Sequence, residues 1–164
     1  ERGEEAIDSL PTSISKNKEA AAEVIENNVR RLIVNERPVN PKYYDMMSEL
    51  LDALIEKRRK DAIDYAEYLK EIVELTKRVK TPSTYAGYPA SMSTMGRRAL
   101  FDNLDRNEVL ALQVDREVLL SKEHGWIGHH IKEKKVRNAL RRVLNDESLL
   151  NAILEIVKLQ PEYQ

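Results

Sequence analysis

The sequence predicts an all-α fold: a helical bundle of about six to seven helices that includes a long helix pair, one extended loop and no sheet. Glycine and proline interrupt helices, since glycine loses much backbone entropy on folding and proline lacks the N–H that a helix needs. They leave four long uninterrupted runs, residues 12–37, 42–81, 97–124 and 129–160. Within these runs apolar residues recur every three or four positions, and the alternation typical of strands is missing.

Length and charge narrow the class of protein. A chain of 164 residues is long enough for one domain with a substantial core, so we expect a single helical domain over residues 1–164. It has no cysteine, which excludes disulfides and thiolate metal sites. Its 27 basic and 28 acidic residues give a net charge of −1, so no overall field attracts nucleic acid or an anionic membrane. No apolar run reaches the length of about 18 residues that a membrane crossing needs.

The start of the chain indicates a fragment excised from a larger subunit, because it begins with Glu1 rather than methionine. Its first residues are charged and form no signal peptide, and residues 1–15 are expected to be a flexible lead-in. A helix follows from about Asn17 to Asn35, with one apolar stripe that faces a core. Asn40 and Pro41 then supply an N-cap and a first helical residue for the next helix.

The apolar register of residues 42–80 continues through two charged positions, Arg58 and Asp61, which one continuous helix would bury. A break near Ile63 avoids this burial, and Asp64 with Glu67 forms a capping box that can start a new helix. We therefore predict two long helices here, with a single helix over residues 41–80 as the alternative.

Residues 81–96 have no helical period and contain two prolines and two glycines, which predicts a long loop. Loops of this length in a compact domain commonly bind partners or stay disordered. Four side chains could dock a partner: Tyr85, Tyr88, Met92 and Met95. The alternative, which we favour, is that these side chains pin the loop to the core.

A short helix is predicted over Arg97–Leu104, and a second capping box, Asp105 with Glu108, is expected to open the next helix. The apolar residues of that next helix lie nearly all round its wheel, which predicts a central helix packed on more than one side. They are Val109, Leu110, Ala111, Leu112, Val114, Val118, Leu119 and Leu120.

Trp126 lies between Gly125 and Gly128, and these glycines predict a turn. We favour Trp126 as a core residue over Trp126 as a binding residue. Two further amphipathic helices follow, and Asp146 is expected to cap the last one.

Nothing in the sequence predicts catalysis, a metal or a cofactor. The histidines, His124, His129 and His130, lack the i, i+3 or i, i+4 spacing that places two metal ligands on one helix. Glu133 and Lys135 match two residues of a carboxylate–lysine nuclease signature, but both lie on a predicted amphipathic helix. Phosphate-binding glycine loops and nucleophile elbows are missing. We expect no catalytic, cofactor-binding or metal-binding residue and no small-molecule substrate.

One stretch is strongly basic. Between residues 129 and 142 six cations stand against a single acid, Glu133, so the stretch carries a net charge of +5. Such a helix face can contact DNA phosphates or an acidic protein, although most basic faces are simply solvated. The six cations are Lys132, Lys134, Lys135, Arg137, Arg141 and Arg142.

An ordered set of segments carries a further inference: AAAEVIENNVRRLI (20–33), NPKYY (40–44), MSELL (47–51), LIE (54–56), RR (58–59), YAEYLKEIVEL (65–75), RALFDNL (98–104), GW (125–126), KE (132–133) and VR (136–137). In order and spacing these segments resemble the C-terminal helical region of the R subunit (HsdR family) of type I restriction endonucleases. The resemblance covers most of the chain from about residue 17 onward.

The resemblance implies a bacterial, cytoplasmic assembly element that docks an ATP-dependent DNA translocase and endonuclease onto the methyltransferase core of M and S subunits. It implies no nuclease or nucleotide-binding residue in this chain. ATP and Mg are expected only in the absent parts of the parent protein. A module that contacts DNA through the basic helix 132–142 is the alternative.

Overall fold

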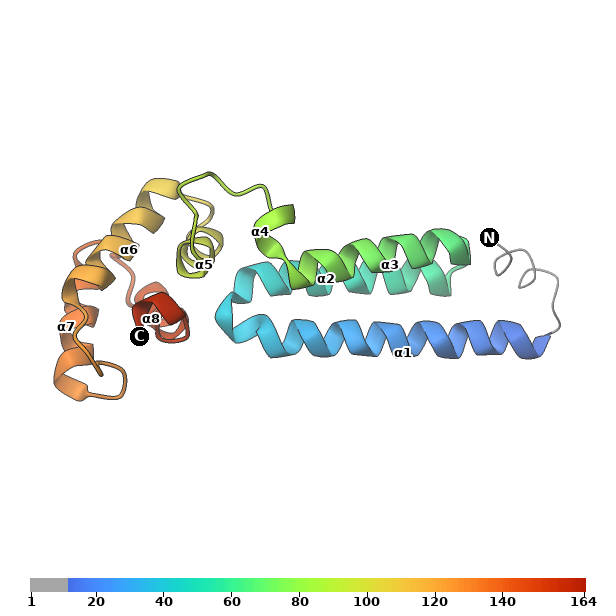
Figure 1. The fold of residues 1–164 in the computed structure, drawn as a ribbon, viewed down its shortest axis with the longest axis horizontal. Coiled ribbons are helices and arrows are strands. Elements are labelled where there is room, and N and C mark those ends of the chain that lie inside the picture. The colour runs from blue at the N-terminus through green and yellow to red at the C-terminus, as the bar shows by residue number, and fades with distance from the viewer. Residues whose placement is uncertain (1–11) are drawn as a thin grey trace. The chain divides into compact units, whose positions relative to one another are not determined.

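The computed structural model describes residues 12–164, and this part of the chain is all α-helical. It forms eight α-helices and two short 3-10 turns and contains no strand (Figure 1). The predicted all-α fold class is confirmed. None of these helices combines the length and the apolar composition that a membrane crossing requires.

Contacts group the described residues into two compact units. The first unit holds the chain up to Asn35 together with Tyr44–Tyr85, and the second holds Glu36–Tyr43 together with Ala86–Gln164. The expectation of a single domain over residues 1–164 stays a prediction, and the two units are described separately below.

The first unit consists of three long helices that run side by side (Figure 1) and one helical turn. They are α1 (Thr12–Glu36), α2 (Pro41–Arg59), α3 (Tyr65–Lys80) and the short α4 (Pro82–Tyr85). The first helix begins at Thr12 rather than near Asn17, so part of the expected flexible lead-in 1–15 is helical. The rest of that lead-in, residues 1–11, lies outside the described residues.

The helix starts at α2 and α3 follow the predicted caps. Pro41 is the first residue of α2, and Asn40 Oδ1 accepts the N–H of Tyr43 at 3.4 Å. The carboxylate of Asp64 accepts the N–H of Glu67 at 2.8 Å and starts α3. The predicted break between two helices is therefore confirmed.

The expectation that the break keeps Arg58 out of the interior is wrong, because its side chain is largely buried in the first unit. Its guanidinium contacts the carboxylate of Glu26 on α1, with Nε 2.7 Å from Oε1 and Nη2 3.3 Å from Oε2. The two side chains are only 11% and 5% exposed. The hydroxyl of Tyr68 on α3 donates to the same Glu26 oxygen at 3.0 Å, so one carboxylate links all three long helices. Burial, with help from the Glu26 charge, raises the pKa of Tyr68.

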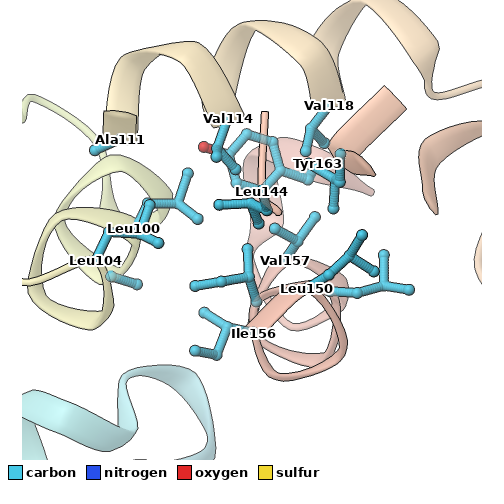
Figure 2. Close-up of a cluster of buried hydrophobic side chains, with 14 of the residues drawn as sticks. Leu100, Leu104, Ala111, Val114, Val118, Leu144, Leu150, Ile156, Val157 and Tyr163 are labelled. Atoms are coloured by element: carbon cyan, nitrogen blue, oxygen red, sulfur yellow. The ribbon is translucent and has the colours of Figure 1, made fainter. Parts of the chain in front are cut away.

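The second unit consists of four helices around a hydrophobic core. They are α5 (Met95–Asn103), α6 (Glu108–Ser121), α7 (His130–Arg141) and α8 (Glu147–Lys158), followed by the 3-10 turn η2 (Pro161–Tyr163). Figure 2 shows side chains of α5, α6 and α8 pointing toward one another around Tyr163, including Leu100, Val114 and Val157. Asp146 caps α8, as predicted, by accepting the N–H of Leu149 at 3.0 Å.

The segment before α6 corrects two predictions. The predicted loop 81–96 is interrupted, since Pro82–Tyr85 forms α4 and Met95 already belongs to α5. The N-cap of α6 is Asn107, whose Oδ1 accepts the N–H of Leu110 at 3.0 Å, and not Asp105. Asp105 and Arg106 instead adopt the left-handed conformation, with φ values of 54° and 57°, which turns the chain between α5 and α6.

The last turn of the chain closes the core of the second unit. Tyr163 is fully buried, and its hydroxyl donates to Asp115 Oδ1 on α6 at 2.6 Å. Arg97 Nε on α5 donates to the other oxygen of Asp115 at 3.0 Å. The indole N–H of buried Trp126 donates to the main-chain oxygen of Tyr163 at 2.6 Å, so Trp126 is a core residue, as favoured above.

Gly96 allows this last turn to approach α5. Its N–H donates to the carboxylate of Glu162. A Cβ atom at this position would lie 2.6 Å from Cε2 of Tyr163 and 2.7 Å from the same carboxylate. The absence of a side chain at Gly96 is therefore a packing requirement.

Glu26→Ala is expected to lower the free energy of unfolding by about 3–5 kcal/mol, because it leaves the buried Arg58 guanidinium without its partner. The control is Asp52→Ala, which removes the exposed partner of Arg30 and should cost at most about 1 kcal/mol. Urea denaturation of both variants measures the difference, and equal losses would contradict a structural role for the buried pair.

Gly96→Ala is expected to lower stability by about 1 kcal/mol or more, since overpacking of a well-filled site costs about 1–3 kcal/mol. Helix propensity alone predicts the opposite sign, because alanine favours a helix over glycine by about 1 kcal/mol. The denaturation midpoint therefore decides between them, and a more stable alanine variant would refute the close contact with Tyr163.

Candidate interaction surface

The four predicted docking side chains of the loop divide into two internal and two exposed residues. Met92 is buried, and Tyr88 packs against the core of the second unit. Tyr85 and Met95 are exposed and belong to α4 and α5. The favoured interpretation, that the side chains pin the loop to the core, therefore holds for Tyr88 and Met92 only.

Tyr88 is held by a buried carboxylate. Its hydroxyl donates to Asp102 Oδ2, which also accepts from Asn40 Nδ2 at 2.8 Å. The guanidinium of Arg106 lies 3.6 Å from the other oxygen and 5.8 Å from the Tyr88 ring centre. Burial raises the pKa of Asp102, although hydrogen bonds from Tyr88 and Asn40 act in the opposite direction. This network fixes the loop, and a partner has no access to the Tyr88 hydroxyl without breaking it.

The basic stretch on α7 is largely paired with acids from other parts of the second unit. Glu123 pairs with Lys135, and Glu117 lies 2.8 Å from the guanidinium of Arg142. Glu147 contacts Arg141 at 2.5 and 3.3 Å through two oxygens. Three of the six cations thus face carboxylates that lie outside residues 129–142.

The remaining three cations differ from one another. Lys132 donates to the main-chain oxygen of His124 at 2.6 Å, and Arg137 donates to the side chain of Asn151. Within residues 12–164, Lys134 has no side-chain partner and is exposed. The paired acids therefore make the net positive charge at this stretch smaller than the sequence alone indicates.

The histidines and Glu133 have structural partners. His129 caps α7, since its Nδ1 accepts the N–H of Lys132 at 3.4 Å. Glu133 accepts from the N–H of Gly128 at 2.9 Å and pairs with Lys158 at 3.1 Å, and these contacts lower the pKa of Glu133. All three histidines are exposed. Across residues 12–164 no three His, Asp or Glu side chains gather in a group that could hold a metal ion.

The surface that sequence reasoning missed is the outer face of α6. The helix buries one stripe, Ala111, Val114, Asp115 and Val118, and contacts both α5 and α7. Leu110 and Leu112, on either side of the stripe, also pack against the core, so the predicted packing on more than one side is confirmed, while one face stays exposed. Val109 and Leu120 lie on the opposite face and are 67% and 71% exposed. Apolar residues all round a wheel are typical both of a central helix and of a helix that meets a partner, so the pattern alone could not distinguish these two.

Comparison of the chain with protein-family profiles, with curated protein sequences and with solved structures found no match. The resemblance to type I restriction R subunits therefore rests on the segments quoted above.

The network around Asp102 predicts a pH dependence of stability. Burial raises the pKa of Asp102 in the folded state, so folding favours the protonated acid. This contribution to stability is fully present below the usual carboxyl pKa of about 4, and it is lost as the pH rises through the higher folded-state pKa. Asp102→Asn removes the titrating group. Compared with this variant, the native protein should lose stability as the pH rises, as measured by urea denaturation across that range. A stability difference that stays constant or changes in the opposite direction would contradict the raised pKa.

Proposed function

We propose that this chain is a helical docking domain that, like the C-terminal region of type I restriction R subunits, attaches an ATP-dependent translocase and endonuclease to the M and S subunits. In this proposal the chain itself is not an enzyme and binds no cofactor, and it acts in the cytoplasm.

The residues that carry the family resemblance support a shared fold. Many of them are buried in one or the other unit, so the shared pattern is mainly a pattern of packing. The buried members are Ala22, Val29, Ile33, Tyr43, Tyr44, Met47, Leu51, Leu54, Tyr68, Ile72, Leu75, Ala99, Leu100, Phe101, Leu104, Trp126 and Val136.

The outer face of α6 is the single observation that carries the docking role. Val109 and Leu120 expose large apolar side chains on the side of the helix opposite its buried stripe. Burial of such groups against a partner is favourable by about 25 cal/mol per Å² of apolar surface. Exposed large apolar side chains with polar neighbours are typical of protein interaction sites, and here Gln113 and Arg116 lie between the two on the same face.

The basic stretch supports DNA binding less strongly than the outer face of α6 supports protein binding. Glu117, Glu123 and Glu147 contact three of its cations and lower the positive charge that would attract phosphates. Of the six cations of this stretch, Lys134 alone has no hydrogen-bond or ion-pair partner within residues 12–164.

A pull-down of the full chain against a purified M–S complex tests the proposal. We expect the two to co-purify and Val109→Glu to reduce the yield about tenfold, the scale of a lost interface anchor. Val24→Glu is the matched control, because Val24 is a similarly exposed helical valine on α1, at 59%.

Two results would overturn the proposal. One is failure of the native chain to retain M and S. The other is salt-sensitive binding of duplex DNA that falls with Lys134→Glu plus Arg137→Glu, which would favour the DNA-contacting alternative.

A further inference from the structure

A shallow groove of about 510 Å³ lies between the end of α6 and α7 in the second unit. Leu120 and residues 121–123 form one side. Lys135, Asn138, Ala139 and Arg142 form the other, at spacings of three and four that cover about two turns of α7.

The groove has one exposed apolar side chain. Leu120 is largely exposed at its α6 wall, where an apolar side chain of a partner can pack against it, and the small, buried Ala139 at the α7 wall leaves room for that side chain. The neighbouring Leu119 does not line the groove and is less exposed, at 45%.

The charge along the groove is positive. Lys135 lies on α7, and Arg142 directly follows this helix. Lys122 directly follows α6, and its ammonium donates to the main-chain oxygens of Gln164 at 2.8 Å and Glu162 at 3.3 Å. On the outer face of α6, one turn before Leu120, Arg116 is exposed and has no side-chain partner within residues 12–164.

The acids at the groove neutralise this charge only in part. Glu123 pairs with Lys135 and Glu117 with Arg142. Both cations are more than half exposed, and ion pairs between exposed side chains are weak. Lysine carries three N–H donors and arginine five, so both side chains can also contact carboxylates of a partner while they keep Glu123 and Glu117.

We infer that this groove binds an acidic amphipathic helix of a partner protein. An apolar side chain of the helix packs on Leu120, beside the small Ala139, and its carboxylates contact Lys135, Arg142 and Arg116. The groove fits this mode of recognition, in which a helix lays its apolar face between two others and charges fix its orientation. The inference deepens the proposed docking function, since it gives the chemistry of the partner surface.

Two synthetic helical peptides of about 18 residues, long enough for several turns, provide the probe. Both carry leucine at every third or fourth position, and one has glutamate and the other lysine along the flanks. Their binding to the full chain is followed by fluorescence anisotropy. We expect the glutamate peptide to bind at least about tenfold more tightly than the lysine peptide, and the difference to shrink as salt is added.

Neighbouring residues give matched controls for the groove. Leu120→Gln and Lys135→Glu should each weaken the glutamate peptide about tenfold. Leu119→Gln and Lys134→Glu change the same residue types one position away, outside the groove, and should alter binding less than about twofold.

Equal binding of the two peptides, no binding of the glutamate peptide, or equal losses in the control variants would overturn the inference. Duplex DNA that competes with the glutamate peptide would assign the groove to phosphates instead. The pull-down with M and S is a separate result. The docking function can therefore hold while the groove assignment fails, and the groove can bind the peptide even if M and S are not retained.

Discussion

The three buried carboxylates in the described residues are each shared between a tyrosine hydroxyl and an arginine guanidinium. Glu26 is held by Tyr68 and Arg58, Asp115 by Tyr163 and Arg97, and Asp102 by Tyr88 and Arg106. A buried charge without such partners costs several kcal/mol, so Glu26 and Asp115 each specify which elements must meet around them. Asp102 on α5 instead holds the loop before this helix and the turn after it. In the second unit the constraint at Asp115 fixes α5 and η2 on the inner face of α6, and the opposite face of α6 is thereby left outward.

This arrangement explains how a chain with little net charge can present a specific surface. Asp115 and the small apolar residues of α6 make its buried contacts, while Val109, Arg116 and Leu120 lie on the other side of the helix. Basic side chains of α7 are mostly engaged within the unit and contribute a modest positive rim rather than a broad field. Such a surface suits a protein partner with apolar and acidic side chains better than a polyanion.

Local signals in the sequence were sufficient where one residue decides the backbone. Asn40, Asp64 and Asp146 start helices because their side chains accept an N–H three residues later, and this geometry needs no distant contact. The prediction of Asp105 as the N-cap of α6 is wrong, because the left-handed turn at Asp105 and Arg106 moves the cap to Asn107. The pairing of Arg58 with Glu26, and of Arg142 with Glu117, could not be predicted, since the partners lie on other helices. For the same reason the basic stretch looked more strongly charged than it is.

We propose that the outer face of α6 is covered by a protein partner when the chain is assembled. Hydroxyl-radical footprinting of the chain, free and in the presence of the M–S complex, measures this coverage for individual side chains. We expect oxidation of Val109 and Leu120 to fall on assembly, while oxidation of the exposed Val24 on α1 stays the same. Unchanged oxidation of Val109 and Leu120 in the assembled state would contradict it.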